Sequence, residues 1–197
     1  MKFTEGPLPG ICLIQSEPHV DERGSFARIF CETELAGQGL PHRFVQASLS
    51  RNHRVGTVRG LHFQWPPSRE GKLVRCVAGA IFDVMVDLRP SSETFMRHFA
   101  VPLSGESGMG VYIPQGFAHG FQTLSDDTTV LYQMSEAYRS GFDGGCRYDD
   151  PAFAIEWPRP PSAVSERDRN APLFDPDAYR AEHALRASDP RTCRGAT

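Results

Sequence analysis

The 197-residue chain has few cysteines and no closely spaced pair of them. The five residues Cys12, Cys31, Cys76, Cys146 and Cys193 are odd in number and widely separated, which argues against a disulfide framework and against a zinc ribbon. Unpaired thiols are typical of a reducing compartment, so we expect a cytoplasmic location.

The sequence also lacks a long apolar run and a strong net charge. The segment Met1–Pro7 has no apolar region of the kind found in signal peptides, and no later stretch is long enough to span a membrane. The formal net charge of -3 provides no global basic field for nucleic acid or anionic membrane. We therefore expect neither partner, and an anionic ligand must be held by local arginines and lysines.

No long segment before residue 160 shows helical periodicity, which argues against alternating β and α units. Short runs rich in β-branched and aromatic residues instead alternate with glycine and proline, and this pattern is typical of an all-β sandwich or barrel. The predicted strands are Ile11–Gln15, Phe26–Cys31, Phe44–Ser50, Val58–Gln64, Leu73–Val77, Ala80–Leu88, Phe95–Leu103, Val111–Ile113, His119–Leu124 and Thr129–Ser135.

The Ala80–Leu88 run alternates most clearly. Its even-numbered residues from Phe82 to Leu88 are all apolar and predict a core face. The opposite face combines Asp83 and Asp87 with apolar residues, and this mixture fits either the wall of a site or a solvated surface.

The character of the sequence changes after Pro151. We predict one domain over residues 1–172 and a C-terminal tail over 173–197, with an extended connector at Trp157–Pro161. Within the tail, Asp175–Ala187 is predicted to form a helix with Asp175 as its cap, and Ser188–Thr197 to be disordered.

Several common catalytic signatures are absent. There is no His-x-His pattern with a downstream glutamate, as metal-dependent cupins require. There is also no Gly-x-Ser-x-Gly elbow and no phosphate-cradling glycine loop. The metal-ligand pattern of metal-dependent cupins is therefore missing from the sequence.

Two glycine-containing strand segments each carry one basic residue that is a candidate for the site. In Arg59-Gly60-Leu61-His62-Phe63-Gln64, His62 shares a face with Gly60 and Gln64 and therefore lies beside open space. In Gly71-Lys72-Leu73-Val74-Arg75, Lys72 opens a strand and can reach the same cavity. A structural histidine and a solvated edge lysine are the competing interpretations.

Three further clusters carry groups capable of acid–base chemistry. His119 lies between two glycines and two phenylalanines, which fits either a core histidine or close approach of a ligand. Tyr132 alternates with apolar Val130 and Met134, as a core tyrosine with its hydroxyl at the rim would. Ser165-Glu166-Arg167-Asp168 has the form of a helix capping box.

Taken in this order and spacing, the clusters resemble the dTDP-4-dehydrorhamnose 3,5-epimerase family. The likeness covers roughly residues 8 to 172 and implies a cupin-type jelly-roll β-barrel, a homodimer, no metal or redox cofactor, and a role in deoxysugar and polysaccharide biosynthesis. The matching segments are Asp21–Gly24, Phe44–Gln46, Arg59–Gln64, Gly71–Cys76, Phe82–Val84, Asp87–Arg89, Ile113-Pro114, Gly116–Phe121, Leu131-Tyr132, Trp157-Pro158, Ser165 and Asp168.

The resemblance implies a division of catalytic roles. His62 is similar to the family's catalytic base and Asp168 to its dyad partner, while Lys72 resembles the group that stabilises the enolate. Tyr132 resembles the acid on the opposite face. The expected reaction is proton abstraction next to the 4-keto group of a nucleotide-linked 4-keto-6-deoxy hexose, followed by reprotonation from the other face.

The resemblance also implies a substrate-binding set, with Arg59 and Arg23 on the diphosphate and His119 in the sugar pocket, oriented by Asp83. The remaining members of this set are Phe26, Gln46, Ser48 and Arg167.

Two departures from the family pattern occur where the family contacts the nucleotide: Ala47-Ser48 after Gln46, and Ala27-Arg28 after Phe26. They leave open a CDP- or GDP-linked substrate in place of dTDP. The sequence is also compatible with a 3-epimerase, a related keto-sugar isomerase, a non-catalytic nucleotide-sugar binder or a metal-dependent cupin.

Overall fold

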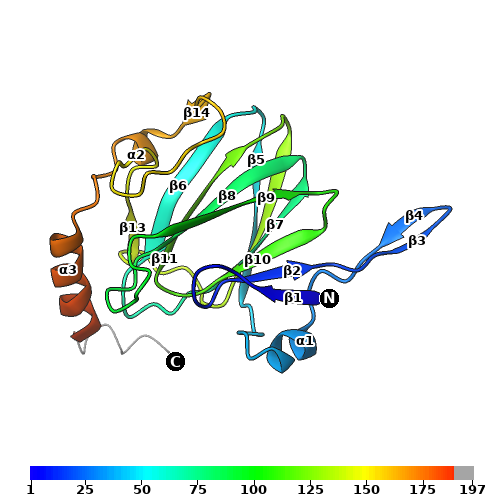
Figure 1. Cartoon of the computed structure of the whole chain (residues 1–197), viewed down its shortest axis with the longest axis horizontal. Coiled ribbons are helices and arrows are strands. Elements are labelled where there is room, and N and C mark those ends of the chain that lie inside the picture. Colours follow the sequence, from blue (N-terminus) through cyan, green and yellow to red (C-terminus); the bar gives the residue numbers. More distant parts are fainter. Residues whose placement is uncertain (189–197) are drawn as a thin grey trace.

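The computed structural model describes residues 1–188 as a barrel of two facing β-sheets with short helices at its edges (Figure 1). The first sheet has the strand order β1 (Lys2–Glu5), β2 (Cys12–Gln15), β10 (Met109–Ile113), β7 (Lys72–Ala78), β12 (Thr128–Met134) and β5 (Gln46–Asn52). The second has the order β13 (Asp143–Gly145), β6 (Thr57–Gln64), β11 (Phe117–Thr123), β8 (Ala80–Asp87) and β9 (His98–Ser104), and β14 (Ala163–Val164) pairs with β6.

Neighbouring strands are antiparallel in both sheets, except that β14 runs parallel to β6. Strands adjacent in a sheet are mostly distant in sequence, as in β10 against β2 or β12 against β5. This connectivity confirms the predicted all-β, cupin-type jelly roll. None of the helices among the described residues is long and apolar enough to cross a membrane.

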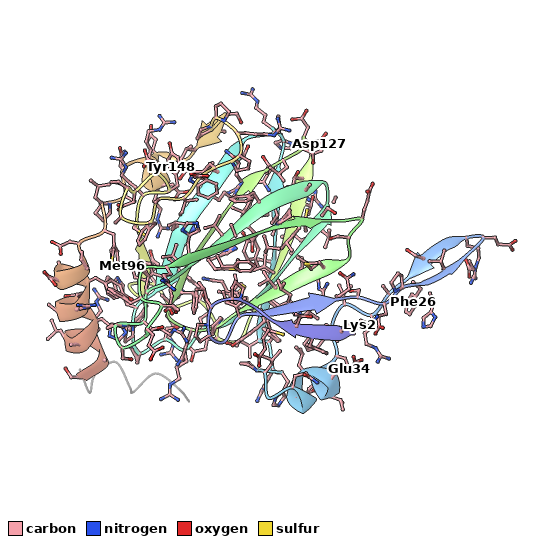
Figure 2. All side chains as sticks on the ribbon, viewed as in Figure 1. Lys2, Phe26, Glu34, Met96, Asp127 and Tyr148 are labelled. Atoms are coloured by element: carbon pink, nitrogen blue, oxygen red, sulfur yellow. The ribbon has the colours of Figure 1, made fainter. Side chains whose placement is uncertain are left out.

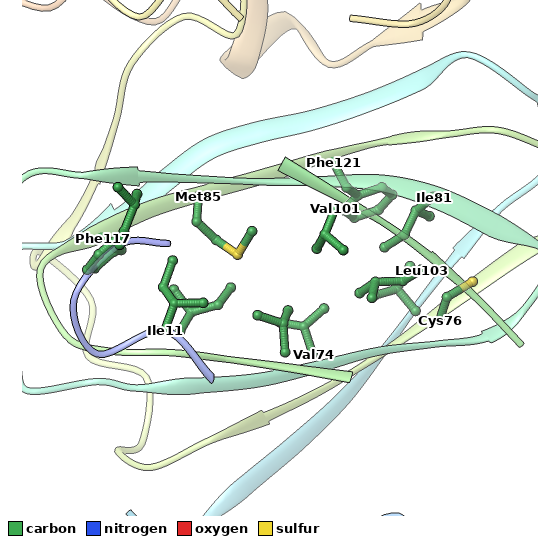
Figure 3. Close-up of a cluster of buried hydrophobic side chains, with 13 residues drawn as sticks. Ile11, Val74, Cys76, Ile81, Met85, Val101, Leu103, Phe117 and Phe121 are labelled. Atoms are coloured by element: carbon green, nitrogen blue, oxygen red, sulfur yellow. The ribbon is translucent and has the colours of Figure 1, made fainter. Parts of the chain in front are cut away.

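The main core lies between the two sheets. Val74 and Val130 project into it from the first sheet, and Met85 and Phe121 from the second, all of them completely buried. Figure 3 shows these layers meeting, with Val74 below Met85 and Val101. The same inward-facing rows of β7, β11 and β12 continue into the site described below.

The outer face of the second sheet is also covered. Val84, Val86 and Leu88 pack there with Phe153 and Tyr179 from the C-terminal part of the chain. Both faces of β8 are therefore buried, and Asp83 and Asp87 are fully inaccessible. The solvated-surface interpretation of that face is wrong, because its carboxylates point into the folded interior.

The C-terminal helix α3 (Pro176–Ser188) forms within one residue of the predicted range. As predicted, Asp175 caps it, its Oδ1 accepting the N–H groups of Asp177 and Ala178 at 3.0 Å each. The helix packs on the barrel through Tyr179, which stacks on Trp65. The division into a 1–172 domain and a tail stays a prediction, and residues 189–197 lie outside the described ones.

The segment after residue 15 differs from its prediction. The predicted strand Phe26–Cys31 is wrong: β4 (Gly24–Phe26) pairs only with β3 (His19–Asp21) and ends at Phe26, and residues 27–31 pair with no strand in the described chain. Helix α1 (Glu32–Gly37) follows, and its six residues are too few to show helical periodicity. The β3–β4 hairpin projects away from the barrel (Figure 1).

Candidate active site

Two adjoining cavities, of about 330 and 240 Å³, lie between the sheets, and His62, Lys72 and Tyr132 line both of them. His62 comes from the second sheet, and the other two come from the first. The inward rows of the barrel change from apolar to polar here, because Lys72 follows the line of Val74 and Tyr132 the line of Val130. The predicted base, enolate stabiliser and acid therefore share one space.

His62 pairs with the carboxylate of Asp168, with Nε2 and Oδ1 2.7 Å apart. The side chain of Asp168 is only 5% exposed, whereas that of His62 is 45% exposed toward the cavity. A carboxylate on Nε2 leaves Nδ1 as the unprotonated ring nitrogen of neutral imidazole. This arrangement suits a general base that becomes an imidazolium beside a fixed negative charge.

Helix α2 (Glu166–Arg169) presents Asp168 to the histidine. Its cap is the predicted Ser165, whose Oγ accepts the backbone N–H of Asp168 at 3.0 Å. Only the Ser165 half of the predicted capping box forms, because the Asp168 carboxylate bonds to His62 and Gly60 N–H.

Gly60 brings the strand of His62 close to its neighbour. It has φ +125°, and a Cβ there would lie 2.6 Å from the Cα of Gly120. Its N–H donates to Asp168 Oδ2 at 3.2 Å. Glycine is required at this position by conformation and by space.

The environment keeps Asp168 ionised. Burial alone would raise the pKa of this carboxyl, but the hydrogen bond from His62, the charge of His62 and the bonds from Gly60 and Ser165 outweigh burial and hold the pKa below its ordinary value.

Tyr132 is half-buried, and its ring packs edge-on against the ring of His119 at a centroid distance of 5.8 Å. Burial raises the pKa of its phenol far above the ordinary value, nearby Asp83 raises it further, and Arg59 lowers it slightly. Tyr132 is thus held in the protonated form that an acid requires.

His119 is buried and bonded to Asp83, with Nε2 and Oδ1 2.7 Å apart. The contact is the one expected if Asp83 orients His119. The other oxygen of Asp83 has no hydrogen-bond partner among the described residues.

Lys72 lines both cavities, and its Nζ lies 3.1 Å from Oε1 of Glu70. Sequence reasoning missed Glu70, which lines the larger cavity. The sequence feature that could have identified it is its position two residues before Lys72, immediately before Gly71.

The remaining predicted binding residues lie at the rim of the cavities, apart from two. Gln46, Ser48 and Arg167 line the larger cavity, and Arg59 lines the smaller one. Arg59 is positioned by Asn52, whose Oδ1 accepts its Nε–H at 2.7 Å.

Arg23 and Phe26 are not brought to this cavity. They lie on the projecting β3–β4 hairpin, far from the barrel interior (Figure 2). Phe26 is 78% exposed, and Arg23 pairs with Asp21 within its own turn.

Two further residues at the cavity were not found from the sequence. Tyr138 donates its hydroxyl to Asp143 Oδ1 at 3.0 Å, and Asp143 also pairs with Arg167 at 2.8 Å. Tyr138 lies in the irregular segment after β12, and Asp143 begins the three-residue strand β13, which is too short to show an alternating pattern. Among residues 1–188 no group of three or more His, Cys, Asp or Glu side chains is arranged to hold a metal ion.

Known proteins share this sequence pattern over most of the chain. A family model described as dTDP-4-dehydrorhamnose 3,5-epimerase matches residues 5–176. The dTDP-4-dehydrorhamnose 3,5-epimerase of Methanothermobacter thermautotrophicus is 43% identical over 182 residues, which cover 90% of this chain and 97% of that protein. The dTDP-4-dehydrorhamnose 3-epimerase of Streptomyces niveus is 38% identical over 88% of this chain and 84% of its own.

A solved structure extends the likeness to three dimensions. The dTDP-6-deoxy-D-glucose-3,5-epimerase from Legionella pneumophila, in complex with dTDP-4-keto-L-rhamnose, superposes with a TM-score of 0.83 at 36% identity. The match covers 87% of this chain and 92% of that one.

Proposed function

Because the chain belongs to the dTDP-4-dehydrorhamnose 3,5-epimerase family, we propose that it epimerises a dTDP-linked 4-keto-6-deoxy hexose at carbons 3 and 5. The observation that carries the proposal is that His62 and Tyr132 approach one cavity from opposite sheets. A substrate ring lying between them meets a base on one face and an acid on the other.

The first step is removal of a hydrogen from a carbon next to the ketone. The 4-keto group acidifies these hydrogens, because the carbanion delocalises onto oxygen as an enolate. His62 takes the proton, and the imidazolium that results is stabilised by ionised Asp168 at 2.7 Å.

The charge that develops on the ketone oxygen needs a fixed counter-charge. Lys72 supplies an ammonium, and His119, which lines the same smaller cavity, is proposed as a second polar contact to the carbonyl region. Such preorganised groups stabilise the enolate more than water does, because they need no reorientation when the charge appears.

The second step returns a proton from the opposite face. Tyr132 is the donor, and its raised pKa has two consequences. The phenol remains protonated until the enolate forms, and its tyrosinate readily recovers a proton from solvent at the cavity mouth. Inversion follows because donor and base lie on different sides of the ring.

The diphosphate is proposed to bind at the rim, where Arg59 presents a planar guanidinium fixed by Asn52. Gln46, Ser48 and Arg167 line the larger cavity and are proposed to contact the nucleotide.

We further propose a homodimer in which the β3–β4 hairpin of each chain reaches the cavity of its partner. Val20 and Phe26 are 75% and 78% exposed on this hairpin, so the rest of the described chain does not cover these apolar side chains. In trans, Phe26 could stack on the nucleotide base and Arg23 could bind the diphosphate. Free Cys12, Cys31, Cys76 and Cys146 support the proposal of a cytoplasmic enzyme.

Mixing two inactive variants tests the dimer. An Arg23→Ala/Phe26→Ala chain and a His62→Ala chain, exchanged into mixed dimers, regain one working site if the hairpin acts on the partner. Activity that stays at the level of the separate variants contradicts action in trans, and a monomer by light scattering contradicts the dimer itself.

The activity is tested by incubating the enzyme with dTDP-4-keto-6-deoxyglucose in deuterated water. We expect deuterium at carbons 3 and 5, and NMR shows which carbons have exchanged. Exchange at carbon 3 alone would make the chain a 3-epimerase, the activity named for the Streptomyces niveus relative. Tight nucleotide binding without deuterium exchange would indicate a non-catalytic binder. Loss of activity when a chelator removes metal ions would indicate a metal-dependent enzyme.

A further inference from the structure

Glu70, an acidic residue that lines the larger cavity, has no role in the mechanism described above. Glu70 Oε1 lies 3.1 Å from Lys72 Nζ, and both residues line the larger cavity. The side chains of Lys72 and Glu70 are 17% and 8% exposed, so the pair is largely withdrawn from solvent. An exposed ion pair contributes little to stability. An ion pair that borders a reaction site can instead fix the position of a charge.

The loop that carries Glu70 is cross-linked to the end of β12. Glu70 N–H donates to Ser68 Oγ at 3.2 Å, and Ser68 Oγ donates to Glu136 Oε2 at 3.0 Å. Gly71 N–H donates to Ser135 Oγ at 2.8 Å. Because β12 also carries Tyr132, these bonds fix the backbone of Glu70 relative to the strand of the proposed acid.

Lysine needs such a support more than the other residues of the site. Its ammonium is a point charge on a flexible four-carbon stem with three equivalent donors, and nothing in the side chain itself fixes its direction. The ion pair with Glu70 places a negative charge 3.1 Å from the Lys72 ammonium and so restricts the positions that the flexible side chain takes. Each basic group lining the larger cavity then has its own carboxylate: His62 has Asp168, Arg167 has Asp143 and Lys72 has Glu70.

We propose that Glu70 is a positioning residue, which holds the Lys72 ammonium where the enolate oxygen forms. The inference rests on the proposed function, because it assigns Glu70 to the stabilisation of that oxyanion. The interaction matters mainly when charge develops, so Glu70 acts on kcat rather than on KM.

The test measures kcat and KM for deuterium incorporation into the keto sugar. Glu70→Ala is expected to lower kcat about tenfold, because the Lys72 ammonium loses the counter-charge that holds it, with KM within about twofold of the wild type. Glu70→Gln retains an oxygen acceptor and is expected to recover most of the rate. If Glu70→Ala fails to fold, Glu70→Asp, which draws the carboxylate back by one methylene, replaces it and is expected to lower kcat several-fold.

Glu136→Gln is the matched control. It removes a negative charge from the segment after β12 that anchors the Glu70 loop, and it keeps an acceptor for the Ser68 hydroxyl and the Arg69 N–H. The ion pair of Lys72 is with Glu70 and not with Glu136. Its kcat should stay within about twofold of the wild type, as for ordinary surface substitutions. An equal fall in kcat for Glu136→Gln would overturn the inference, because loss of any negative charge near the Glu70 loop would then explain the effect.

A double-mutant cycle with Lys72→Met isolates the pair. If Glu70 acts through Lys72, Glu70→Ala has no further effect once Lys72 is replaced. The same tenfold loss in both backgrounds overturns the inference. If the wild-type enzyme exchanges deuterium and Glu70→Ala has the same kcat, only this inference is wrong. If the wild-type enzyme shows no exchange, the proposed function is wrong and the inference fails with it.

Discussion

Replacing Asp168 by asparagine tests the electrostatic part of the mechanism with little change of shape. The amide is nearly isosteric with the carboxylate and retains an acceptor for Gly60 N–H, which now bonds to Oδ2 at 3.2 Å. The negative charge 2.7 Å from His62 Nε2 is lost. The imidazolium formed on proton abstraction then lacks its counter-ion, and the preferred tautomer of the neutral ring is no longer fixed.

The geometry sets the size of the effect. Two unit charges about 4 Å apart interact by about 4 kcal/mol at an effective dielectric of 20. The side chain of His62 is 45% exposed, so solvent screens part of this energy and about 2–4 kcal/mol is the working range. That range corresponds to a fall in kcat of between about thirtyfold and a thousandfold.

The assay is the initial rate of deuterium incorporation at saturating substrate, compared with Asp143→Asn. Asp143 lies at the same cavity but pairs with Arg167 and Tyr138 rather than with the base. A rate for Asp168→Asn within threefold of the wild type, or a loss matched by Asp143→Asn, would refute the electrostatic reasoning.

Three more predictions concern other parts of the molecule. Arg59→Ala should raise KM about 10- to 100-fold with a smaller change in kcat, because it removes charge-assisted bonds to the diphosphate. Steady-state kinetics measures both constants, and an unchanged KM contradicts the binding role of Arg59. Lys72→Met should lower kcat about 10²–10³-fold, as for loss of one oxyanion-stabilising group, and stopped-assay product analysis by NMR measures it. The buried Asp87 carboxylate tests stability: burial raises its pKa, but the bonds from Arg89, Ser92 and Thr94 more than offset burial and hold it below the ordinary value. Its stabilising effect is therefore present above the unfolded pKa of about 3.9 and is lost as pH falls through the lower folded value. Asp87→Asn should lower the free energy of unfolding by about 2–3 kcal/mol at pH 7. Denaturant titrations should show that the difference in this free energy between wild type and variant narrows below about pH 4, and a difference independent of pH contradicts the assignment.

The core strands were predictable because their side chains alternate between two surfaces. Val58–Gln64, Leu73–Val77 and Ala80–Leu88 were each located to within one residue of the observed ends. The faces of Ala80–Leu88 could not be fully interpreted from the pattern, because a second buried layer contributed by residues 146–179 covers the apolar side. Only tertiary structure shows that Asp83 and Asp87 face inward.

The residues of the site were predictable where they belong to regular strands. His62, Lys72, His119 and Tyr132 meet because strand alternation points all of them into the barrel. Tyr138 was not predicted because its segment follows no period, and Asp143 because its strand has only three residues. Glu70 was not predicted because its significance depends on a contact with Lys72. The hairpin position of Arg23 and Phe26 depends on chain path and assembly, which local pattern does not encode.

The most direct test of the central claim is the configuration of the sugar recovered from a Tyr132→Phe enzyme in deuterated water. The phenyl ring keeps the packing against His119, so only the proton donor is removed. We predict that His62 still exchanges the hydrogen and returns deuterium to the same face, while inversion slows by about 10²–10⁴-fold. Inversion at the wild-type rate would contradict the claim that a base and an acid act on opposite faces of the ring.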